Sequence, residues 1–226
     1  SERRQVEVEF KNTRKPLVNV SVEKLWKNKN GDYTGNLPEK IYIQLQRKAS
    51  NENNSSWSAV EYNGKTYTEI THNIYTKKWE CSFTGLDKFV DYTQESSALW
   101  LYRVVEVSVS TSDGGNGNTT ETVNQIEDGK VIELSVGKFT VTYTASNGIS
   151  FSKDESSGKE TGTETITNTY QPPKPTIQLL KIEAGTAGEN LKKLKGATFS
   201  IEKIQSDGTV DNSSIPNQTT KKDGLA

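Results

Sequence analysis

Hydrophobic and polar residues alternate along much of the chain, and a period of two is typical of β-strands that bury one face. The clearest alternation covers residues 17–26. One face of this predicted strand is apolar except for a single lysine, and it consists of Val18, Val20, Val22, Lys24 and Trp26. A buried ammonium group is costly unless it is paired or loses its proton. Three interpretations follow: the strand ends near Val22, Lys24 reaches back to the surface, or Lys24 is buried with a partner.

The remaining pattern predicts an all-β protein. Alternation predicts further strands at residues 6–13, 41–45, 79–83, 99–109, 131–134, 139–144, 163–170, 177–181 and 197–203. Asn63-Gly64 predicts a tight hairpin turn, because both residues tolerate a positive φ. We expect polar loops at residues 48–56, 111–120 and 152–162, whereas residues 87–98 fit either a loop or a short helix. No segment shows a clear period of 3.6.

Composition narrows the class of protein. Only 31% of the 226 residues are hydrophobic, which is low for an α/β enzyme and ordinary for a β-rich extracellular module. The 28 basic and 29 acidic residues are interspersed, so no basic field exists to attract nucleic acid or an acidic membrane. No apolar run approaches about eighteen residues, so we expect no membrane insertion. Cys81 is the only cysteine, and an intramolecular disulfide is therefore excluded.

A short arrangement occurs twice and indicates tandem domains. A strand ends in an inward asparagine, a proline-marked break follows, and the next strand carries an inward lysine. Asn12 and Lys24 form the first instance, and Asn168 and Lys181 form the second. We therefore expect the end of one domain at 1–13, a complete domain at 17–171, a proline-rich linker at 172–175 and the N-terminal part of a third domain at 176–226. The abrupt start and end predict a fragment of a longer protein.

Three polar residues of complementary type fall on apolar faces of the complete domain: Lys24, Glu106 and Asn168. Desolvation lowers the pKa of a lysine, which can then act as a neutral nucleophile. Desolvation also raises the pKa of a glutamate, which can then donate a hydrogen bond to an amide carbonyl. Lys24 would attack the Asn168 amide carbon and release ammonia. Because the reaction has no substrate and occurs once per molecule, it is a maturation step.

Five segments resemble the Cna B-type domain of Gram-positive surface adhesins and pilins. They are VSVEKLW, LPEKIYIQL, WECSFTGL, YRVVEV and TITNTY, in that order. The resemblance covers residues 17–171, and IQLLKIEA with LKGATFSI resembles the start of another such domain. It implies an immunoglobulin-like β-sandwich in which Lys24 and Asn168 form an isopeptide bond promoted by the acid Glu106. By the same resemblance, Asn12 and Lys181 are cross-link candidates of neighbouring domains.

The resemblance predicts a structural stalk or pilus-shaft module on the cell wall of a Gram-positive bacterium, outside the cell. Its partners would be other domains of the same surface protein or pilus. The alternative is an adhesin module whose insertions at 48–76 and 111–162 bind a host protein or glycan. Within the complete domain, the alternative to a bond is an unreacted, buried ion pair. A further alternative is strand exchange, in which residues 1–13 of one molecule complete residues 176–226 of another.

Other candidates for chemistry are weaker. Cys81 is expected to be a core residue, because nothing places it beside the only histidine, His72. Residues 113–118 lack the spaced carboxylates of a calcium site, so we expect neither a metal nor another cofactor. Trp57 lies in a polar stretch and is expected to pack, although an exposed indole could contact a ligand. No nucleophile–base–acid set is visible, and we expect no enzyme beyond the single self-cross-linking reaction.

Overall fold

The computed structural model describes residues 15–52, 56–94, 97–113, 119–173, 181–183, 193–199, 203–204, 210–211 and 218–219. The predicted strand at 6–13, including Asn12, lies outside the described residues. The chain divides into two compact units, residues 1–172 and 173–226, and the division falls within the predicted linker. The described residues form strands, turns and irregular segments without any helix, so the described fold is all-β. None of them therefore belongs to a helix long and apolar enough to cross a membrane.

The first unit contains a seven-stranded sheet, which we call sheet A. Its strand order is β2-β1-β12-β10-β9, with β6 also paired to β1 and β11 also paired to β12. The strands of sheet A are β1 (Leu17–Asn28), β2 (Gly31–Asp32), β6 (Trp79–Asp87), β9 (Val131–Leu134), β10 (Gly137–Tyr143), β11 (Phe151–Lys153) and β12 (Glu160–Gln171). Period-two alternation predicts the longer strands of this sheet, β1, β6, β10 and β12, because each of them buries one face.

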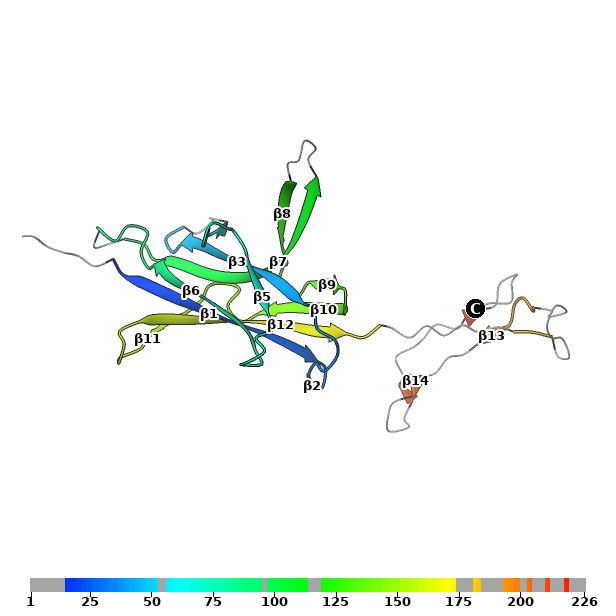
Figure 1. Ribbon diagram of the computed structural model, residues 1–226. Helices are drawn as coiled ribbons and strands as arrows, with labels where there is room; N and C mark the ends of the chain where they lie inside the picture. Colours follow the sequence, from blue (N-terminus) through cyan, green and yellow to red (C-terminus); the bar gives the residue numbers. More distant parts are fainter. Residues whose placement is uncertain are drawn as a thin grey trace, which may run out of the picture. The chain divides into compact units, whose positions relative to one another are not determined.

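A second sheet of five strands, sheet B, packs against sheet A (Figure 1). Its order is β4-β3-β7-β8, and β5 pairs with β3. The strands of sheet B are β3 (Lys40–Ala49), β4 (Ser58–Ala59), β5 (Thr68–Thr71), β7 (Trp100–Asp113) and β8 (Thr119–Gln125). The two sheets together make a β-sandwich, as their apolar faces require.

The first and last strands of the sandwich lie side by side. β1 pairs with β12 in parallel, from Val18 opposite Glu160 to Lys27 opposite Thr169. β6 covers the other edge of β1 in antiparallel orientation. The strand where the chain enters the sandwich is therefore hydrogen-bonded directly to the strand where it leaves.

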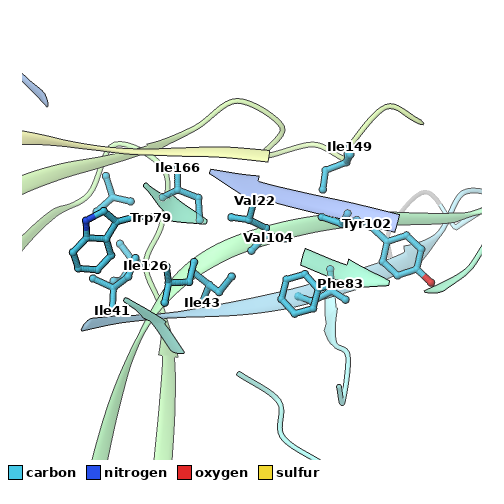
Figure 2. Close-up of a cluster of buried hydrophobic side chains, with 14 of the residues drawn as sticks. Val22, Ile41, Ile43, Trp79, Phe83, Tyr102, Val104, Ile126, Ile149 and Ile166 are labelled. Carbon is cyan, nitrogen blue, oxygen red and sulfur yellow. The ribbon is translucent and has the colours of Figure 1, made fainter. Parts of the chain in front are cut away.

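The hydrophobic core fills the space between the sheets. Burial alternates along β1 from Val18 to Trp26, and these inward side chains are 0–6% exposed. Figure 2 shows Val22 and Ile166 of sheet A facing Ile43 and Val104 of sheet B. For the strands that carry these four residues, sequence period therefore predicts both the strand and the face that it buries.

The turn at Asn63-Gly64 has the backbone conformation that its sequence predicts. Both residues have positive φ, 53° and 78°, and the backbones of Tyr62 and Lys65 are hydrogen-bonded across the turn. This is the conformation that a two-residue hairpin turn requires, and Asn and Gly adopt it most readily.

Two expectations about loops need correction, and at residues 87–98 the structure decides between the two predicted alternatives. β7 continues to Asp113 and pairs with β8 from Thr119. The described residues of the predicted loop at 111–120, which are 111–113 and 119–120, are therefore strand residues of a hairpin that projects from the sandwich (Figure 1). Threonine favours extended backbone, and the pairing of β7 with β8 extends the ladder. The predicted loop at 152–162 likewise contains the end of β11 and the start of β12. The described part of residues 88–98 is an irregular loop closed by a bridge between Phe89 and Leu99.

The second unit is described only in short pieces. β13 (Thr198–Phe199) pairs with β16 (Gln218–Thr219), and β14 (Lys203–Ile204) pairs with β15 (Val210–Asp211). Lys181 is exposed, whereas the alternation at 177–181 predicts an inward position. The apolar residues that share its predicted strand, Ile177 and Leu179, lie outside the described residues.

Candidate functional site

The three polar residues on apolar faces meet inside the sandwich. Lys24 Nζ lies 2.8 Å from Glu106 Oε2, and Asn168 Nδ2 donates to Glu106 Oε1 at 3.2 Å. Lys24 and Glu106 are each 2% exposed, and Asn168 is fully buried. A single carboxylate therefore contacts both the lysine and the asparagine, one through each oxygen.

Strand register places these side chains. β1 and β12 run in parallel with Lys24 opposite Ile166 and Trp26 opposite Asn168, so all four point into the sandwich. Glu106 comes from the other sheet, where β7 pairs with β3. The carboxylate thus reaches across the core to two adjacent strands.

Two of the three interpretations of Lys24 are wrong. β1 does not end near Val22 but continues to Asn28, and Lys24 does not reach the surface. The strand continues because β12 and β6 both pair with it beyond Val22. The lysine stays inside because Glu106 meets it there and the Trp26 ring centroid lies 4.9 Å from its Nζ.

The surroundings of Lys24 favour its neutral form. Burial lowers the pKa of Lys24 to about 8, and the nearby Glu106 carboxylate opposes this shift only in part. At a given pH, a larger share of Lys24 is therefore neutral, with a free lone pair on Nζ, than of an ordinary lysine.

Only one end of the Asn168 side-chain amide is hydrogen-bonded. Its amide nitrogen faces Glu106, whereas its carbonyl oxygen is buried without a hydrogen-bond partner. The sequence argument expects the opposite orientation, with the carbonyl accepting from a protonated Glu106. A half-turn of the amide group exchanges the two ends and brings the carbonyl to the same carboxyl. An unpartnered buried carbonyl costs about 1–3 kcal/mol, so this amide is not in a fully satisfied environment.

A second buried glutamate, Glu164, is absent from the sequence-based site. It is fully buried on the same face of β12 as Asn168. Its Oε1 accepts from the Thr144 and Ala145 backbone amides at 2.9 and 3.1 Å and from the Thr144 hydroxyl at 3.0 Å. Its Oε2 has no partner, and burial raises the pKa of Glu164. Glu164 continues the inward alternation of Ile166 and Asn168, but a glutamate between two threonines is also typical of a solvated part of a strand.

The weaker candidates have structural surroundings. Cys81 is half-buried on β6, and burial raises the pKa of its thiol to about 12, which disfavours a nucleophilic role. Trp57 is half-buried between Lys48 and Arg103, which lie 4.9 and 4.6 Å from the indole ring. Among the described residues, no group of three or more metal-ligating side chains is present. Most of the segment 113–118 lies outside those residues.

Comparison with known proteins adds no identity. No protein-family model matches the chain, and no curated protein matches it.

Proposed function

We propose that this chain is a structural stalk or shaft module of a Gram-positive cell-surface adhesin or pilin, held by an intramolecular Lys24–Asn168 isopeptide bond. In this proposal the sandwich is of the immunoglobulin-like Cna B type, and it is one of several tandem modules. Its place is outside the cell, on the cell wall. The family part of this proposal depends on the sequence resemblance described above.

One observation carries the proposal: a buried amine and a buried amide share one carboxylate, and they come from the first and last strands of the sandwich. Lys24 and Asn168 contact opposite oxygens of Glu106. An ordinary buried ion pair needs no asparagine, and it contributes little or nothing compared with apolar residues of the same size. The arrangement is better suited to a reaction that removes the buried charge.

The proposed reaction balances without a cofactor. Lys24 transfers a proton to Glu106, which leaves a neutral amine and a neutral acid in the low-dielectric core. The Nζ lone pair attacks Cγ of Asn168, and a C–N bond forms as the bond from Cγ to Nδ2 breaks. Glu106 passes its proton to the departing Nδ2, which lies 3.2 Å from Oε1, and takes up the second proton that Nζ loses as the amide forms, so the carboxyl ends protonated. Ammonia leaves, and the product is a neutral secondary amide.

A ligand-binding adhesin module is the second candidate. Ile74 and Tyr75 lie in the insertion at 48–76 and are 64% and 88% exposed. They occupy the turn between β5 and β6, where the Asn73 side chain accepts from the backbone amides of Tyr75 and Thr76 at 2.9 and 3.1 Å. Two exposed apolar side chains on an ordered turn are a possible contact surface. The projecting β7–β8 hairpin is polar, and this favours the stalk.

Intact mass tests the proposal directly. We expect the purified chain to weigh one ammonia less than its calculated mass, and a Glu106→Ala variant to have its full calculated mass. Glu164→Gln is the matched control, because it alters another buried glutamate, whose hydrogen bonds come from Thr144 and Ala145. This control should still lose ammonia. A parent chain at its full calculated mass would refute the bond and move the binding function ahead.

A further inference from the structure

A tyrosine of sheet A inserts its hydroxyl into the strand ladder of sheet B. The Tyr143 hydroxyl, at the end of β10, accepts from the Glu106 backbone N–H at 3.0 Å and donates to the Ile126 carbonyl at 2.8 Å. Ile126 in turn donates its N–H to the Glu106 carbonyl at 3.0 Å. Both hydrogen-bonding functions of the hydroxyl are therefore used on the main chain around Glu106.

This insertion replaces one rung of the ladder. In an antiparallel pair, two facing residues normally exchange both N–H to C=O bonds. Between Glu106 and Ile126 one of these bonds is direct, and the other runs through the Tyr143 hydroxyl. A side chain of sheet A therefore holds the backbone of Glu106, and the carboxylate of Glu106 reaches back across the core to sheet A.

Tyr143 also lies in line with the reacting strands. It pairs with Ile166 across β10 and β12, and Ile166 pairs with Lys24 across β12 and β1. The side chains of these three residues share a row that crosses three strands of sheet A. Asp128 holds the backbone of Tyr143, because its Oδ1 accepts a hydrogen bond from the Tyr143 N–H at 3.1 Å. The row therefore links the position of Lys24 to the backbone of Glu106.

We infer that Tyr143 is a positioning residue for the Lys24–Asn168 bond, holding Glu106 where its carboxylate meets both partners. The inference depends on the proposed function. Tyr143 acts through the Glu106 backbone and touches neither the amine nor the amide. Burial raises the pKa of the Tyr143 hydroxyl far above neutrality, so it remains protonated and does not take part in proton transfer.

Removing the hydroxyl should slow bond formation. Tyr143→Phe keeps the ring and leaves the Glu106 N–H and the Ile126 carbonyl without their shared partner. The two main-chain groups can then move together to restore a direct rung, and this shift displaces the Glu106 carboxylate. Reactions that depend on a fixed geometry lose up to about 10²-fold in rate for a displacement near 1 Å. We expect a slowing of roughly 10- to 100-fold on that basis.

Tyr102→Phe is a matched control. Tyr102 is 1% exposed on the same strand as Glu106, and its hydroxyl donates to the Asp87 carbonyl at 2.7 Å. The substitution also removes one buried tyrosine hydroxyl bonded to a main-chain carbonyl, but it leaves the Glu106 backbone untouched. Asp128→Ala is a second test variant, because it frees the Tyr143 backbone while keeping the hydroxyl. It should slow the reaction less than Tyr143→Phe does.

The experiment follows ammonia loss by intact mass after cell-free synthesis of each full chain, at several pH values, with tryptophan fluorescence reporting folding. We expect Tyr143→Phe to fold, to react more slowly than the parent and to keep the parental pH midpoint. Tyr102→Phe should react at the parental rate. A parental rate for Tyr143→Phe, equal slowing of both tyrosine variants, or a shifted midpoint would overturn the inference. If the parent itself never loses ammonia, the proposed function fails and the inference with it.

Discussion

The double substitution Lys24→Met/Glu106→Gln separates the stability of a cross-link from that of a buried ion pair. Methionine fills much of the space of the lysine stem, and glutamine can still accept from Asn168 Nδ2, which lies 3.2 Å from Oε1 in the parent. Replacing a buried ion pair by hydrophobic groups of similar volume is often neutral or stabilising, whereas a glutamine amide group left unpaired beside the methionine costs about 1–3 kcal/mol. A loss of stability well above that cost is therefore attributable to the missing bond.

The size of that loss follows from the loop that the bond closes. Lys24 and Asn168 are 144 positions apart (168 minus 24). The chain-entropy relation for cross-links gives about 5 kcal/mol for a loop of this length. For a domain of this size, 1 kcal/mol shifts Tm by roughly 2–4 °C, so we expect the double variant to melt about 10–20 °C below the parent.

Circular dichroism melts and urea titrations of both chains, each with its intact mass recorded, measure this difference. A second signature is the urea m-value, which should be smaller for the cross-linked parent because its unfolded state stays compact. A double variant that melts within about 3 °C of a parent that has lost ammonia would contradict the entropic reasoning, since that shift corresponds to only about 1 kcal/mol.

Two further predictions concern buried groups outside the cross-link. Burial raises the pKa of Glu164, so its contribution to stability is complete below its unfolded pKa and is lost as pH rises through its folded pKa. Glu164→Gln should therefore melt higher than the parent at pH 7 and show a flatter profile between pH 4 and 8; an unchanged profile would contradict this. Because burial raises the pKa of Cys81 to about 12, its thiolate fraction at pH 8 should be roughly 10³-fold below that of a free cysteine. Iodoacetamide should label the native chain far more slowly than the urea-unfolded chain.

Sequence period was sufficient to place the first two members of the candidate site. Lys24 and Asn168 each stand in an otherwise apolar face, and the register of β1 and β12 buries both. Glu106 is also on a predicted inward face, but its contact with both residues depends on how the two sheets pack. The alternation along a strand identifies which side chains point inward, and the packing of the two sheets decides which of those side chains are in contact.

Two residues escaped the sequence argument for physical reasons. Glu164 is flanked by Thr163 and Thr165, so its surroundings in the sequence look like a solvated edge, although the bonds from Thr144 and Ala145 hold it inside. Tyr143 was expected only as part of a strand. Its bonds to Glu106 and Ile126 join residues far apart in the chain and in different sheets, and no local pattern encodes them.

The parallel arrangement of β1 and β12 gives the proposed bond its mechanical consequence. Tension on a stalk would enter at Leu17 and leave at Gln171, at opposite ends of two strands that share a continuous ladder. Without a bond, this shear is resisted by main-chain hydrogen bonds and core packing. With the bond, tension would pass along residues 17–24, across the new amide and along residues 168–171. Residues 25–167 would then carry no tension, and the sandwich could not be drawn out to its full contour length. A chain whose amino acids are only 31% hydrophobic and include a single cysteine has few other means of resisting extension.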